Sequence, residues 1–135
     1  MRRGHGWTRA LVVAALLTVV GASAGAHAEE PAAGTKPDVE ITIVGVEYEG
    51  TKLWVPSTIV ARKGDRVKVH LISKIPSEPA QHGFAIDAVK VAEVVNRGEP
   101  KSVEFVADAV GLFPIYCQLH PAHVGGQLLV VDATP

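Results

Sequence analysis

Hydrophobic and polar residues alternate along most of the chain after residue 38, which is the pattern of half-buried β-strands. In one such segment Val67, Val69 and Leu71 fall on one face. Lys68 and His70 fall on the other, so His70 is expected to face solvent. No segment shows a convincing helical stripe. The alternation predicts the following strands: Val39–Tyr48, Leu53–Ala61 with an interruption at Pro56, Val67–Ser73, Phe84–Asp87, Val91–Val95, Lys101–Ala107, Phe113–Cys117 and Gln127–Asp132.

Turn-forming residues separate these predicted strands at positions 49–50, 63–65 and 96–100. A Pro-containing loop, residues 74–81, leads the chain to His82. Seven or eight short strands at this spacing predict an all-β fold, a Greek-key β-sandwich or barrel.

The first 28 residues have the features of a secretory signal peptide. Three arginines flank or precede an apolar run, Ala10–Val20, and small residues lead to a cleavage site after Ala28. The run is shorter than the roughly 20 residues that a membrane helix needs. We therefore expect a periplasmic or secreted protein with no stable membrane insertion. Residues 29–38 predict a flexible lead-in, and residues 39–135 predict one domain.

The composition of the exported part excludes one class of partner. Removing the leader leaves about 107 residues, a length that fits one small domain. Ten basic residues then stand against 14 acidic ones, so the net charge is −4 with the histidines neutral. Nucleic-acid binding is disfavoured because it requires a basic surface. The sequence leaves the oligomeric state open.

Metal-binding residue types gather near the C-terminus around Cys117, the only cysteine. His120 and His123 follow it by three and six residues, and His82 lies 35 residues upstream, where a strand pattern begins. A lone thiol forms no internal disulfide, and in an oxidising compartment it is a liability unless something occupies it. One thiolate and three imidazoles suit copper. The same set is acceptable to zinc in a tetrahedral structural site.

Three motifs resemble those of the cupredoxins, small copper proteins built on a β-sandwich: Lys63-Gly64-Asp65-Arg66-Val67, His82-Gly83-Phe84, and the aromatic-Cys-x-x-His-Pro loop that begins at Tyr116 and precedes a final strand. The resemblance implies one copper ion per chain, cycling between Cu²⁺ and Cu⁺. It implies electron transfer with transient redox partners such as a cytochrome or a copper oxidoreductase. It also implies that the Gly83 amide donates to the Cys117 sulfur.

The spacing of the ligand loop is similar to that of amicyanin, a cupredoxin with a short loop. Carried over, this spacing makes His82, Cys117 and His120 the equatorial ligands and places His123 where the family has an axial methionine. The only methionine, Met1, lies in the leader. Because imidazole nitrogen binds Cu²⁺ more strongly than a long thioether contact does, we expect His123 to lower the reduction potential.

The stretches Cys117–Pro121 and Gly83–Ala88 also resemble nitrosocyanin, a red copper protein whose ligands are a cysteine, two histidines and a glutamate. His82 takes the place of that glutamate, with Glu78 close upstream. The resemblance implies an alternative function, in which copper with an open position binds or converts a nitrogen oxide or dioxygen. For electron transfer we expect instead a small apolar docking patch, made of Leu119, Pro121, Ala122 and Val124.

Overall fold

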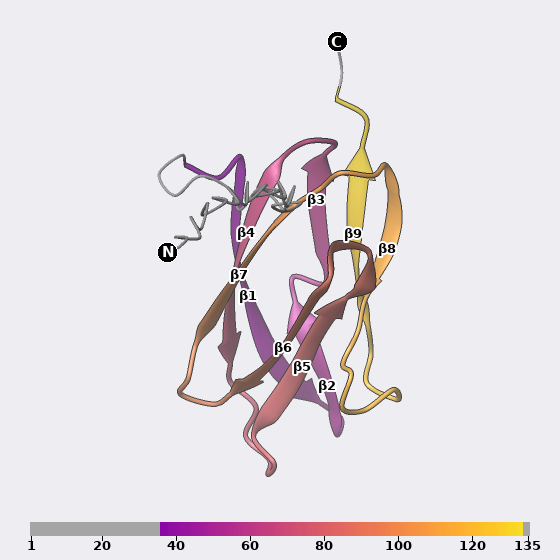
Figure 1. Ribbon diagram of the computed structural model, residues 1–135. Coiled ribbons are helices and arrows are strands. Elements are labelled where there is room, and N and C mark those ends of the chain that lie inside the picture. Colours follow the sequence, from indigo (N-terminus) through magenta and orange to yellow (C-terminus); the bar gives the residue numbers. More distant parts are fainter. Residues whose placement is uncertain (1–35, 134–135) are drawn as a thin grey trace, which may run out of the picture. The chain divides into compact units, whose positions relative to one another are not determined.

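The computed structural model describes residues 36–133, which form nine β-strands and one short 3₁₀ turn (Figure 1). The predicted signal peptide, residues 1–28, and most of the predicted lead-in lie outside the described residues. The elements are β1 (Val39–Tyr48), β2 (Thr51–Val55), β3 (Thr58–Arg62), β4 (Arg66–Ser73), β5 (Gln81–Ile86), η1 (Asp87–Val89), β6 (Val91–Asn96), β7 (Lys101–Val106), β8 (Gly111–Ile115) and β9 (Gly126–Val131).

The strands form three sheets. A four-stranded sheet has the order β2-β1-β4-β7, a three-stranded sheet has the order β3-β9-β8, and β5 pairs with β6. The pairs β1–β4 and β3–β9 are parallel, and the other pairs are antiparallel. Both parallel pairs join strands that do not follow each other in the sequence, because parallel strands need a crossover connection. The predicted all-β sandwich is therefore confirmed.

The sequence pattern and the structure differ in one strand. The stretch around Pro56 was predicted as one interrupted strand, whereas it forms two strands that belong to different sheets: β2 pairs with β1, and β3 pairs with β9. Proline cannot donate to a strand ladder, so the chain changes sheets at this point. The described residues consequently contain nine strands instead of seven or eight.

The core lies between the inner faces of the two larger sheets. The alternation predicted its members, because Val67, Val69 and Leu71 of β4 are all buried, as are Val103 and Phe105 of β7. The remaining strands contribute Ile43, Trp54, Ile59, Ala61, Phe84, Ile86, Val95, Ile115, Leu128 and Val130. Each fully buried side chain of this kind contributes about 1.5–3 kcal/mol relative to an exposed one. This core provides a rigid support for the loops at the end of the sandwich.

The strand directions bring two distant segments to one end of the domain. Figure 1 shows the start of β5 and the connection between β8 and β9 at the same end. His82 is the second residue of β5, and Cys117 begins the connection after β8.

Within residues 36–133, no helix is long and apolar enough to cross a membrane.

Candidate metal centre

A pair of backbone hydrogen bonds places Cys117 beside β5. The Ala85 amide donates to the Tyr116 carbonyl (2.9 Å), and the Tyr116 amide donates to the Ala85 carbonyl (3.0 Å). This isolated bridge extends the end of β8 onto β5. The Gly83 amide then donates to Cys117 Sγ at 3.2 Å, as the resemblance to cupredoxins implied. An amide donor lowers the energy of a thiolate, so the contact suits a sulfur that carries negative charge.

Two consecutive turns fold the loop after Cys117 back toward the sheet. The His120 amide donates to the Cys117 carbonyl (3.2 Å), and the His123 amide donates to the His120 carbonyl (3.0 Å). This path brings His123 close to Cys117 and His82, with 5.4 Å between the ring centroids of the two histidines. One ligand atom from each of His82, Cys117 and His123 lies within 4.8 Å of the other two, a spacing that a single metal ion can bridge.

His120, the fourth predicted ligand, lies at the edge of this group. Its ring centroid is 4.6 Å from that of His123, with an angle of 36° between the planes, and the residue is exposed. His120 is not one of the three residues whose donor atoms converge in the described part of the chain. Its assignment as an equatorial ligand, and that of His123 as the axial one, stay predictions.

The imidazole nitrogens of the centre are suited to a metal. His82 is 1% exposed, and neither of its ring nitrogens has a hydrogen-bond partner among the described residues. His123 Nδ1 is likewise buried and unpaired there. Buried polar atoms are nearly always satisfied, so unpaired nitrogens on two histidines beside one buried thiol indicate that a ligand completes the group. Neutral imidazole and thiolate are ligands of Cu²⁺, Cu⁺ and Zn²⁺, and these residues therefore fit the predicted metal.

The electrostatics of the centre keep His82 neutral. Burial, together with the nearby charges of His123, Lys52 and His120, lowers the pKa of His82 from its ordinary value of 6.5 to about 4. Burial also lowers the pKa of His123, and the charges of His120 and Lys52 act in the same direction. Metal ions bind the neutral form, so protons compete weakly for His82 at neutral pH.

This lowered pKa predicts an acid-dependent stability of the metal-free protein. The unfolded chain takes up a proton on His82 below about pH 6.5, whereas the folded chain does so only near pH 4. The stability is thus complete above pH 6.5 and decreases as the pH falls. We expect the free energy of unfolding to drop by about 2 kcal/mol between pH 7.5 and pH 5, measured by urea denaturation. His82→Asn should lose this pH dependence. An equal slope in both proteins would contradict the burial of a neutral His82.

Trp54 orients His82 in a way that the sequence pattern did not indicate. Trp54 lies on β2 and is buried at 3% exposure. Its ring also stacks on His82, with 5.0 Å between centroids and 27° between planes, and its Nε1–H donates to the Gly83 carbonyl at 2.9 Å. Residues that orient a metal-binding histidine are part of the function of the site.

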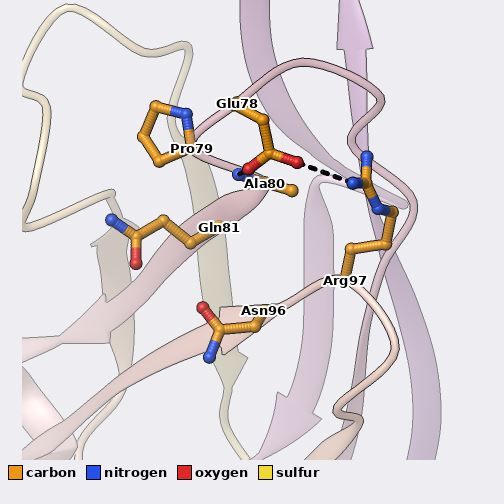
Figure 2. A pocket seen from close by; sticks show the side chains of 6 residues that line it. All are labelled: Glu78, Pro79, Ala80, Gln81, Asn96 and Arg97. Atoms are coloured by element: carbon orange, nitrogen blue, oxygen red, sulfur yellow. Dashed lines mark hydrogen bonds and ion pairs between the residues drawn. The ribbon is translucent and has the colours of Figure 1, made fainter.

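Two residues considered as alternative ligands lie elsewhere. His70 is on the outer face of β4, where its ring contacts Glu40 Oε1 (2.8 Å) and Ser102 Oγ (2.8 Å). Glu78 forms an ion pair with Arg97 at 2.7 Å. Figure 2 shows this pair at the wall of a cavity of about 300 Å³, which Pro79, Ala80, Gln81 and Asn96 also line. Neither His70 nor Glu78 belongs to the converging donor group.

Gly83 is required where β5 passes the thiol. A Cβ atom built on Gly83 would meet Gln118 Oε1 in a severe clash and would lie only 3.0 Å from Cys117 Sγ. We expect Gly83→Ala to displace Cys117 and to weaken copper binding by about 10–100-fold, the usual effect of disturbing the surroundings of a ligand. A competition titration with a copper chelator measures this. Gly98→Ala is the control for the loss of a glycine: its φ of +86° makes alanine strained there, but a Cβ meets nothing within 4 Å, so stability should fall while copper binding is kept. Equal losses of copper affinity in both variants would contradict the steric explanation.

A β-sandwich with a buried cysteine and histidines gathered at one end is typical of the small β-sandwich metal proteins. Residues 10–130 match the family model of the cupredoxin-like domain, and the chain belongs to this family.

Individual relatives agree with this family. Nitrous-oxide reductase of Cupriavidus necator is 45% identical over 56 residues, which cover 42% of this chain and 9% of that protein. The matched stretch thus spans about a tenth of the length of this curated relative. The solution structure of a copper binding protein in the apo form superposes with a TM-score of 0.54 and 22% identity, covering 72% of this chain and 92% of that one. Auracyanin B superposes with a TM-score of 0.57 and 16% identity, covering 76% of this chain and 93% of that one. These two likenesses show the fold.

Proposed function

We propose that the chain is an exported electron carrier that holds one copper ion through Cys117, His82, His120 and His123. The observation that carries the proposal is the convergence of a buried thiol with two imidazoles whose donor atoms lie within 4.8 Å of one another. Copper supplies a one-electron couple, since Cu²⁺ leads the divalent affinity order and thiolate also retains Cu⁺.

The protein's own residues provide the rigidity that fast electron transfer requires. Cys117 is held by the bridge between Tyr116 and Ala85, and His82 is held by the Trp54 ring. Ligands that are fixed by a sheet change their geometry little when the metal changes its charge. This rigidity lowers the energy needed to rearrange the centre on each electron transfer.

The surface near the ligand loop supports a transient redox partner. His120 is exposed, and so are the members of the predicted docking patch, Leu119, Pro121, Ala122 and Val124. A small apolar patch suits brief encounters, because transient redox complexes bury little surface. We infer that an electron enters and leaves through the exposed edge of His120.

The compartment follows from the thiol and the leader. A lone cysteine is buried in the described domain, and residues 1–28 have the pattern of a secretory signal. In an oxidising compartment a metal would protect this thiol. We therefore place the protein in the periplasm or outside the cell.

The metal content of the purified chain tests the proposal. Protein expressed with export should carry about one copper per chain and lose its colour on addition of a reductant. Metal analysis and an optical spectrum before and after dithionite are sufficient. A colourless protein with stoichiometric zinc that cannot take up copper would refute the proposal and would indicate a structural zinc site.

A second candidate function is the binding or conversion of a small molecule such as a nitrogen oxide or dioxygen. The observation that favours it is the position of His120 outside the converging donor group, which leaves three protein donors. A copper ion with three protein ligands has an open position. Addition of azide or nitrite to the oxidised protein separates the candidates: an electron carrier with four protein ligands should keep its spectrum, and an open site should change it.

A further inference from the structure

Lys52 is a buried cation close to the metal centre. It occupies the second position of β2 and is 6% exposed. Its Nζ donates to the Pro79 carbonyl (2.6 Å) and to the Gln81 carbonyl (3.3 Å). Lysine is rarely buried to this extent, because removing an ammonium from water is costly. Its position therefore requires a reason beyond packing.

The partners of Lys52 leave its positive charge largely uncompensated. Both acceptors are neutral backbone carbonyls, and Lys52 takes part in no ion pair within the described residues. Glu47 is opposite Lys52 across the β1–β2 ladder, and its carboxylate accepts a short hydrogen bond from the Ser77 hydroxyl. Two carbonyls satisfy two of the three donors of an ammonium and do not cancel its charge.

The charge acts on the segment that carries the ligand. Lys52 and Trp54 lie two residues apart on the same face of β2, and both are buried. Together they bind the carbonyls of Pro79, Gln81 and Gly83, alternate residues on both sides of His82. Lys52 also lowers the pKa of His82 and that of His123, so its field is felt at two imidazoles of the centre.

We propose that Lys52 tunes the copper centre, its buried charge favouring Cu⁺ over Cu²⁺ and thereby raising the reduction potential. This inference rests on the proposed function. A centre made of one thiolate and neutral imidazoles is neutral with Cu⁺ and carries one positive charge with Cu²⁺. A fixed cation nearby repels the oxidised form more strongly, and burial makes the repulsion larger than it would be in water. The electron for reduction comes from the redox partner protein. The effect of Lys52 opposes that of His123 as an axial imidazole.

Three substitutions separate the charge of Lys52 from its hydrogen bonds. Lys52→Met removes both, Lys52→Gln removes the charge but keeps an N–H donor, and Lys52→Arg keeps both. Lys63→Met is the matched control. This substitution removes one lysine charge from the exposed turn that follows β3. The last residue of β3 pairs with the last residue of β9, and this end of β9 is the one away from the ligand loop.

The reduction potential of the copper-loaded chain is measured for each variant. Lys52→Met and Lys52→Gln should both lower the ratio of the Cu⁺ affinity to the Cu²⁺ affinity by about tenfold. For one electron this corresponds to a fall of about 59 mV in the reduction potential. Lys52→Arg and Lys63→Met should keep the wild-type value.

Each contrary outcome has one meaning. A Lys52→Gln variant with the wild-type potential would overturn the tuning role and reduce Lys52 to a clamp on the loop before β5. If Lys52→Met does not fold, Lys52→Gln and Lys52→Arg still decide between charge and shape. A wild-type chain that takes up no copper would overturn the proposed function and the tuning role together. A copper-loaded chain whose potential is unchanged in both neutral variants would overturn the tuning role alone.

Discussion

Cys117→Ser is expected to abolish the sulfur-to-copper charge-transfer band and to weaken copper binding by more than about 100-fold, beyond the usual loss for an outer contact. Serine is nearly isosteric with cysteine, so the fold should persist. Its hydroxyl is not deprotonated at neutral pH, and a hard oxygen holds Cu⁺ poorly. The Gly83 amide would also lose its acceptor at 3.2 Å. Optical absorption and a chelator competition measure the two effects.

His70→Ala is the matched control for this substitution. His70 is a histidine of the same domain, but its contacts are to Glu40 and Ser102 on the outer face of β4. The band and the affinity should both keep their wild-type values. A charge-transfer band that survives in Cys117→Ser would show that the thiolate of Cys117 is not the ligand. A band that disappears in His70→Ala would contradict the assignment of His70 outside the centre.

Trp54→Ala should be the most destabilising substitution near the centre. Truncation of a buried aromatic ring costs about 3–5 kcal/mol of unfolding free energy. It also removes the surface on which His82 stacks and the donor to the Gly83 carbonyl. We therefore expect a lower urea midpoint and, in the protein that remains folded, copper binding weakened by about 10–100-fold.

Tyr48→Ala provides the comparison for Trp54. Tyr48 is an aromatic residue of the neighbouring strand and is 68% exposed. Its removal should change the unfolding free energy by no more than about 0.5 kcal/mol and leave copper binding intact. Similar destabilisation by both substitutions would mean that burial and the contact with His82 do not explain the role of Trp54.

The period-two alternation was sufficient to predict the fold, because buried and more exposed residues alternate along strands such as β2, β3 and β4. It predicted the buried set in β4, whereas the strand predicted to end at the thiol, β8, ends at Ile115, two residues before Cys117. It could not show that the chain changes sheets at Pro56, because β2 and β3 are distinguished only by their partners, β1 and β9. Strand pairing over long sequence distances leaves no local pattern.

The candidate site was predictable to the extent that it depends on spacing. The single cysteine, the loop histidines and the distant His82 identified the residues that the fold brings together. The roles of Trp54 and Lys52 were not predicted, since they arise where β2 approaches β5 through side chains and not through a backbone ladder. One signal was present in the sequence. Lys52 and the buried Trp54 are two residues apart and therefore lie on the same face of β2, and a charged side chain is unusual on a buried face.

The optical and electron paramagnetic resonance spectra of the copper-loaded protein, compared with those of His123→Met, test the central claim most directly. With His123 as a strong axial ligand, the oxidised protein should be green or red with a tetragonal signature. His123→Met should move the spectrum toward blue and raise the potential, because a weak thioether no longer favours Cu²⁺. An intensely blue wild-type protein whose spectrum is indifferent to His123→Met would contradict the four-ligand copper centre.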